Sequence, residues 1–301
     1  MSARTLVTGA TGYIGGLLAS QLLSEGVSIR VGGRRTTTLN ERFPGLETAE
    51  LDALDASTLP EALHGINTAY YLIHSMEPGT SDFAERDRTA ARNFGEAAKS
   101  AGVRQVVYLG GLGDDSDTLS HHLSSRHETG RVLAEHGPPL IEFRAGIVIG
   151  AGSASFQMLR DLVHRLPAMV TPKWVDTRAQ PIGVDDVITY LSAARDVSTD
   201  GHHLVVEIGG RDVLTYRELM KRFAMAGGRR PPIVVPVPVL TPRLSSLWCG
   251  LVTAVPAAVA RPLIDGLKNE VVVRDDVATR LFPGVSPMTF DEAVKRALAG
   301  R

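Results

Sequence analysis

Short apolar runs alternate with amphipathic segments up to about residue 210 of the chain. The apolar runs, which are rich in β-branched residues, predict strands at 5–9, 27–33, 67–73, 104–111, 140–150 and 203–210. The amphipathic segments predict helices at 13–25, 57–64, 81–101, 120–136 and 155–166. Because such alternation with continuously apolar strands is typical of a parallel sheet covered on both faces, we expect an α/β, doubly wound parallel-sheet fold of the Rossmann type.

The pattern changes at residue 211. Proline and arginine cluster in GGRRPPIVVPVPVLTPR, and the chain closes on TFDEAVKRALAG, which predicts an amphipathic terminal helix. We therefore expect residues 1–210 to form the main domain. Residues 211–301 should form a smaller C-terminal lobe over the strand ends, with 151–182 contributing to it in part.

The first predicted strand runs into the turn TGATGYIG, and a predicted helix follows it. In this pattern Gly9 permits a tight turn, Gly12 lets the backbone approach a pyrophosphate, and Gly15 lets the helix pack close to the strand. The helix N-terminus then presents N–H groups and a positive dipole end to the phosphates. We predict a dinucleotide site here, formed by Thr8, Gly9, Thr11, Gly12, Tyr13, Ile14 and Gly15.

The end of the second strand discriminates between cofactors. A chain that prefers NAD usually carries an acid there, which binds the ribose hydroxyls, but this chain reads VGGRR. Guanidinium groups at Arg34 and Arg35 can bind a 2′-phosphate, so we predict NADP(H); the alternative is two solvated surface arginines. Asp52 and Ala53 follow the next segment and should meet the adenine edge, unless Asp52 simply caps its loop.

Five segments together resemble a known family: TGATGYIG, NTAYYLIHSM, RQVVYLGGLGDD, FRAGIVIG and QPIGVDDVITYL. The chain resembles the short-chain dehydrogenase/reductase superfamily, above all its extended and atypical branches, which include NmrA-like proteins. The resemblance covers about residues 3–210 well and the rest loosely. It implies NADP(H) across the carboxyl ends of the strands, and a substrate between that edge and the C-terminal lobe. Further residues expected beside the cofactor are Leu72, Ile73, His74, Gly110, Gly111 and Arg126.

The resemblance also gives meaning to SHHLSSR (120–126). Family members with the usual reaction carry Tyr, three residues, then Lys on this helix, and a Ser at the end of the preceding strand. The Tyr position falls on His122, the Lys position on Arg126, and the Ser position near Gly110–Gly111. The usual triad is therefore absent.

Three interpretations stay open. In the first, the protein is a reductase in which His122 titrates near neutrality and donates a proton, while Arg126 binds ribose and favours negative charge on a carbonyl oxygen. His74 or Ser75 then assists proton transfer, or else caps the loop backbone. In the second, the protein is a non-catalytic NADP(H)-binding redox sensor or structural binder. In the third, the segment is only a polar helix start with Ser120 as N-cap.

Composition limits the class of partner. Lys+Arg 32 against Asp+Glu 33 leaves no net field to attract nucleic acid. The single cysteine, Cys249, excludes an internal disulfide and a thiolate metal cluster, which fits a reducing cytoplasm, and no histidine spacing predicts a metal site. The acidic turn at 114–117 should be solvated, whereas Arg144, inside a strand, should need a structural partner.

The apolar stretches bear on membrane contact and on the substrate. The opening MSARTLVTGATG shows no export signal, and LSSLWCGLVTAVPAAVA (244–260) is marginal for a membrane span because Pro256 interrupts it. A weak contact of this stretch with a membrane surface or a protein stays open. A lobe lined by such residues would suit a lipophilic carbonyl, enone or quinone, unless they only form the lobe's own core. The sequence does not determine the substrate, the reaction direction or the oligomeric state.

Overall fold

A parallel sheet of seven strands forms the centre of the molecule. The computed structural model describes residues 4–73, 83–114, 119–171, 173–236 and 265–300. Every neighbouring pair in the sheet is parallel, which confirms the predicted doubly wound Rossmann fold. In spatial order the strands are β3 (Glu47–Glu50), β2 (Ile29–Gly33), β1 (Arg4–Thr8), β4 (Ile66–Tyr71), β5 (Gln105–Gly111), β6 (Leu140–Ala145) and β11 (His203–Ile208).

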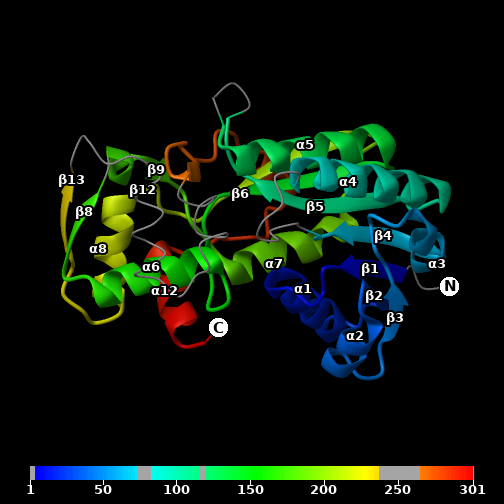
Figure 1. Ribbon diagram of the computed structural model, residues 1–301, viewed down its shortest axis with the longest axis horizontal. Coiled ribbons are helices and arrows are strands. Elements are labelled where there is room, and N and C mark those ends of the chain that lie inside the picture. The colour runs from blue at the N-terminus through cyan, green and yellow to red at the C-terminus, as the bar shows by residue number, and fades with distance from the viewer. Residues whose placement is uncertain (1–3, 74–82, 115–118, 172, 237–264, 301) are drawn as a thin grey trace.

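Helices cover both faces of this sheet (Figure 1). One face packs against α1 (Tyr13–Ser24), α2 (Thr36–Arg42) and α7 (Val184–Ala193). The other packs against α3 (Leu59–Leu63), α4 (Phe83–Ser100) and α5 (His121–His136). Successive strand residues point to opposite faces, so that in β5 Val107 joins the first layer while Val106 and Tyr108 join the second. This double burial explains why the strands read as continuous apolar runs.

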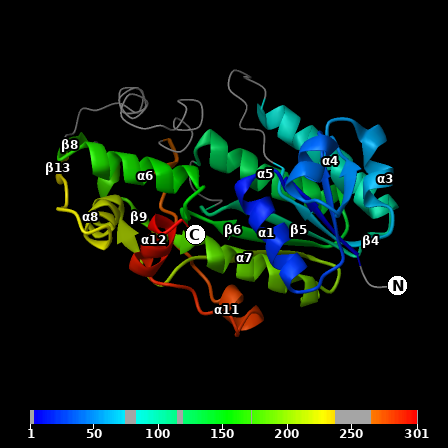
Figure 2. The same cartoon turned by 90° about the horizontal axis from the view of Figure 1, so that it is seen from below.

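A smaller lobe lies beyond the carboxyl ends of the later strands (Figure 2). Its helices are α6 (Ala154–Arg165), α8 (Tyr216–Ala226) and α12 (Phe290–Leu298), which share one apolar core. Three two-stranded sheets accompany them: β7 (Val148–Ile149) with β10 (Ile182–Gly183), β8 (Ala168–Thr171) with β13 (Ile233–Pro236), and β9 (Arg178–Ala179) with β12 (Leu214–Thr215).

Some elements differ from expectation. Strand β3 and helix α2 lie in short, polar sequence, ETAE and TTTLNER, and neither has an apolar period that would reveal it. The run 140–150 breaks into β6 and β7, because the chain leaves the central sheet after Ala145. Part of 211–301 packs on that sheet: Ala278 of α11 (Val277–Leu281) and Phe282 belong to the layer under α7.

The apolar stretch 244–260 lies outside the described residues. Within those residues, no helix combines the length and apolar character needed to cross a membrane.

Candidate cofactor and substrate site

The turn after β1 has the conformation that the glycine pattern requires. Gly9 has φ of +65°, and a Cβ added there would lie 2.4 Å from the carbonyl oxygen of Leu72. A Cβ on Gly15 would lie 2.3 Å from the Gly9 oxygen, so this glycine lets α1 pack onto the turn. A Cβ on Gly12 would meet only that same oxygen, at 3.1 Å, and its other side is open. The turn therefore has the open cradle that a pyrophosphate fits, at the N-terminus of α1.

The other residues predicted at this turn divide between the surface and the core. Thr11 and Gly12 are exposed. The buried Thr8 hydroxyl donates to the Tyr70 carbonyl at 2.8 Å and accepts from the Leu72 N–H at 3.0 Å, so its side chain joins β1 to β4. Tyr13 and Ile14 are half-buried and pack against the core of the sheet.

Three arginines follow β2. Arg34 and Arg35 are exposed in the segment that leads into α2, with Arg35 at the N-cap position. Arg42, which the sequence analysis did not identify, donates from its guanidinium to the Thr11 carbonyl at 2.6 Å. Gly16 makes room for it, since a Cβ there would lie 2.1 Å from the Arg42 nitrogen. No motif marks Arg42, because only the fold brings the last turn of α2 to the glycine turn.

Asp52 and Ala53 follow β3. The half-buried Asp52 accepts a hydrogen bond from the Leu54 N–H at 3.0 Å, which is the local loop cap that the sequence left open. Ala53 is buried, and its carbonyl accepts from Asn93 at 3.0 Å. Contact of this pair with adenine stays a prediction.

A cavity of about 310 Å³ lies where the carboxyl ends of β5 and β6 meet the small lobe. The sheet side contributes Gly110, Gly111, His122 and Arg126, so the structure brings these predicted residues together around one space. The lobe contributes an almost wholly apolar wall that includes Met158, Leu159, Leu162, Trp174, Tyr216, Leu219, Met220 and Leu267. Its volume is within the range of small-molecule pockets, and most of its lining is apolar.

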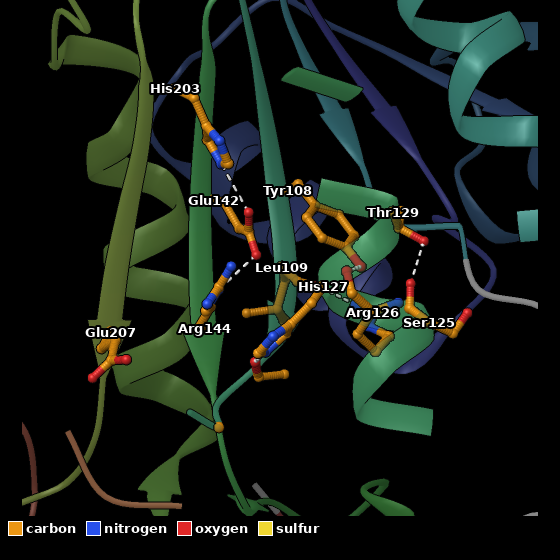
Figure 3. Close-up of polar contacts among 12 residues, drawn as sticks. Tyr108, Leu109, Ser125, Arg126, His127, Thr129, Glu142, Arg144, His203 and Glu207 are labelled. Atoms are coloured by element: carbon orange, nitrogen blue, oxygen red, sulfur yellow. Dashed lines mark hydrogen bonds and ion pairs between the residues drawn. The ribbon is translucent and has the colours of Figure 1, made fainter. Parts of the chain in front are cut away.

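Helix α5 positions the polar end of the cavity. Ser120 is its N-cap, as predicted, and accepts from the Leu123 N–H at 3.4 Å. His122 and Arg126 lie one turn apart and both reach the cavity. The Arg126 guanidinium carbon lies 4.8 Å from the centroid of the Tyr108 ring, and the group donates to the Leu109 carbonyl (Figure 3). A Cβ on Gly111 would lie 2.7 Å from Leu123, so packing against α5 fills the space of a serine side chain.

His122 does not titrate near neutrality, and that expectation was wrong. Burial, and then the charge of Arg126, lower the pKa of His122 from 6.5 to about 4. Its imidazole is therefore neutral at pH 7, able to donate one N–H but not to supply an acidic proton from an imidazolium.

The turn after β5 is not merely solvated. Asp114 forms an ion pair with Arg274 at 2.5 Å, and Arg274 also pairs with Glu207 at 2.5 Å and donates to the Gly113 carbonyl at 2.9 Å. Asp115 and Asp117 lie outside the described residues, as do His74 and Ser75. Across the described ranges, no three His, Cys, Asp or Glu side chains lie together as metal ligands would.

Strand β6 carries a buried carboxylate with two side-chain partners beside the site (Figure 3). The Glu142 carboxylate is fully buried. Its Oε1 lies 2.7 Å from Arg144 Nε, and its Oε2 lies 2.8 Å from His203 Nε2. The prediction that Arg144 needs a structural partner is therefore confirmed. Gly130 of α5 provides the space, since a Cβ there would lie 2.3 Å from the carboxylate.

Sequence comparison finds a family match in the first part of the chain. Residues 9–137 match the family described as NAD(P)H-binding. A sterol demethylase protein B from Methylococcus capsulatus is 31% identical over 114 residues, which are 36% of this chain and 34% of that protein. A 3 beta-hydroxysteroid dehydrogenase/Delta 5→4-isomerase from Mycobacterium tuberculosis is 29% identical over 152 residues, 44% of this chain and 41% of that protein. The chain thus spans less than half the length of these relatives.

Solved structures resemble the whole chain. A nucleoside-diphosphate-sugar epimerase from Staphylococcus aureus has a TM-score of 0.77 at 18% identity, covering 97% of this chain and 99% of its own. A Citrobacter triphenylmethane reductase complexed with NADP(H) has a TM-score of 0.75 at 18% identity, covering 98% of this chain and 99% of its own. An NADPH-dependent quinone oxidoreductase from Escherichia coli, complexed with NADPH, has a TM-score of 0.74 at 22% identity, covering 98% of this chain and 99% of its own. At these identities the likeness is one of fold. Residues 9–137 thus match an NAD(P)H-binding family, and the solved structures share the Rossmann fold of the whole chain.

Proposed function

We propose that this protein is an NADP(H)-dependent oxidoreductase that acts on a small lipophilic carbonyl, enone or quinone. The observation that carries the proposal is the cavity between the strand ends and the lobe. It presents an imidazole, a guanidinium and two glycines on the sheet side, and an apolar wall on the other. A sugar nucleotide, which needs many hydrogen-bond donors, would find few on that wall.

The residues present fit the proposed cofactor. The glycine turn and the N-terminus of α1 would hold the pyrophosphate, and Arg34 and Arg35 would hold the 2′-phosphate. Arg42, which donates a hydrogen bond to the Thr11 carbonyl, would add positive charge beside the pyrophosphate. When bound, the nicotinamide supplies a hydride to the substrate.

The side chains at the polar end suit a conjugated acceptor. Arg126 provides a permanent positive charge toward which a substrate oxygen can gain negative charge. His122 would donate a hydrogen bond as neutral imidazole, the role that its lowered pKa allows. An enone or quinone spreads the arriving negative charge over its π system and so depends less on an acid than an isolated ketone does. The quinone oxidoreductase and dye reductase among the structural neighbours, and the two steroid-related relatives, are in keeping with this substrate class.

A second candidate is a non-catalytic NADP(H) binder, either a redox sensor or a structural protein. The packing of Leu123 against Gly111 favours it, because that packing occupies the place of the family's serine. The Arg126 guanidinium is also engaged with the Leu109 carbonyl. In either case we propose a small-molecule partner, no nucleic acid, and a cytoplasmic location suited to one unpaired cysteine.

One experiment separates these candidates. NADPH and NADH are titrated into the protein by fluorescence, and oxidation of bound NADPH is then followed with a panel of ketones, enones and quinones. We expect tight NADPH binding and turnover of the conjugated members. Tight binding with no turnover across the panel would establish the binder instead.

Cofactor preference has its own test. Replacing Arg34 and Arg35 with Ala should weaken NADPH binding at least about tenfold and leave NADH binding almost unchanged, because only NADPH carries the 2′-phosphate. Arg229 and Arg230, an exposed adjacent pair in the loop after α8, give a control with the same change in charge. An unchanged NADPH-to-NADH affinity ratio in the Arg34/Arg35 variant would refute the assignment.

A further inference from the structure

The lobe wall of the cavity holds two aromatic side chains that can donate hydrogen bonds. Tyr216 is the first residue of α8, and Trp174 lies in the turn 173–176 after β8. Their rings meet edge to face, with centroids 5.9 Å apart and planes at 90°. Both residues line the cavity, on the wall that faces the strand ends.

Neither donor is matched by an acceptor in the described part of the chain. The Trp174 indole nitrogen is buried without a hydrogen-bond partner. The Tyr216 side chain is only 8% exposed, and burial is the sole cause of its raised pKa, with no hydrogen bond or charge contributing. Buried donors are normally hydrogen-bonded, because a buried donor without an acceptor costs free energy.

Packing alone does not explain why residue 216 is a tyrosine and not a phenylalanine. A phenylalanine at 216 would keep the edge-to-face contact with Trp174 and the contact with the apolar wall. A phenol in that place adds a hydroxyl to a residue that lines the cavity, and this hydroxyl stabilises a complex only if a cavity occupant accepts its hydrogen bond.

We infer that Tyr216 is a specificity-determining residue whose hydroxyl donates to a second oxygen of the substrate, remote from the reacting carbonyl, with Trp174 holding the phenol ring in place. The inference rests on the proposed function, which it narrows. The occupant is a lipophile with one oxygen toward His122 and Arg126, and another toward the lobe. A diketone or quinone of fused rings has this distribution, whereas an apolar ketone with a single oxygen lacks the second acceptor.

A matched pair of ligands tests the inference. Androst-4-ene-3,17-dione and androst-4-en-3-one share a skeleton and differ in the second oxygen. Their dissociation constants are measured by calorimetry with NADP+ present, so that the readout does not depend on turnover. The wild-type protein should bind the dione about tenfold more tightly, the factor expected of one hydrogen bond between neutral groups. In Tyr216→Phe this preference should vanish, while affinity for the monoketone stays the same.

Tyr190→Phe is the control, since Tyr190 is also buried in an aromatic cluster, with Phe143 and Phe282, but does not line the cavity. That variant should keep the preference, and both variants should bind NADPH normally. A preference that survives in Tyr216→Phe, or a wild-type protein that binds the two ligands equally or binds neither, would overturn the inference. Binding with the expected preference but without turnover of either ligand would instead count against the proposed oxidoreductase.

Discussion

At the scale of single residues, the proposed chemistry depends most on His122. The resemblance to short-chain dehydrogenase/reductases aligns His122 with their tyrosine, yet burial and the neighbouring Arg126 lower its pKa to about 4. A group that is neutral throughout the physiological range acts by donating a hydrogen bond, not by changing charge. In this respect it resembles a neutral electrophile more than a general acid.

The pH dependence of turnover distinguishes these roles. We expect kcat/KM to be nearly constant from about pH 6 to pH 8, because a pKa near 4 leaves the imidazole neutral across that range. His122→Phe should lower kcat about a hundredfold, and His122→Gln, which retains an N–H donor that does not titrate, should recover part of the loss. A rate that falls with rising pH around 6.5 in the wild type alone would identify an imidazolium donor instead.

The same shift affects stability. Because the folded-state pKa of His122 lies below 6.5, the unfolded chain binds more protons between pH 6.5 and about 4. The contribution of His122 to the free energy of unfolding therefore declines as the pH falls from 6.5 to about 4. It is fully present above pH 6.5.

At the scale of elements, a buried ion pair of Glu142 and Arg144 lies where β6 meets α5. Glu142 receives Arg144 and His203 on its two oxygens, and Gly130 leaves the space for its carboxylate. Removing one member of a buried ion pair costs more than the pair contributes, because the remaining charge is left unpaired. Strand β6 pairs in register with β5, whose end lines the cavity.

Glu142→Gln should therefore lower the free energy of unfolding by about 3 kcal/mol, measured by urea denaturation. Asp276→Asn is the matched control, since it breaks the Arg280–Asp276 pair, whose side chains are 66% and 73% exposed. That change should cost less than about 1 kcal/mol. Equal effects of the two substitutions would show that the buried ion pair has no special weight.

At the scale of the whole molecule, the segment 265–274 links the cavity to both the sheet and the start of α5. Gly266, Leu267 and Val271 line the cavity. Arg274 ties the segment to β11 through Glu207, and to the turn after β5 through Asp114. The Asn269 side chain accepts from the Ser120 N–H at the start of α5 at 3.2 Å. Contacts from one late segment thus position both the turn and the helix that carry the polar end.

Arg274→Ala should raise KM for the carbonyl substrate several-fold and change kcat less, because the residue organises the cavity wall without lining it. Arg274→Lys should restore part of the affinity through its charge. Arg280→Ala, which removes an exposed arginine of α11, serves as the control. A loss confined to kcat, with KM unchanged, would contradict this positioning role.

Local patterns of sequence determined much of this protein. The β-branched runs and amphipathic segments predicted six of the seven strands of the central sheet and six helices within a few residues, because their periods report burial directly. The glycine spacing predicted the turn after β1, and the Ser120 cap predicted the start of α5. Each of these signals acts over a few neighbouring residues, so the sequence displays it in full.

Only the tertiary structure decided the rest. Arg42 reaches the glycine turn across 31 residues, and Arg274 reaches Gly113 across 161, with no spacing to announce either contact. The pKa of His122 depends on how deeply it is buried and on a charge one helical turn away, which composition does not reveal. The cavity likewise needs strand ends and lobe helices that are remote in the chain. Electrostatics and enclosure depend on distances in space, and these are fixed only when the whole chain has packed.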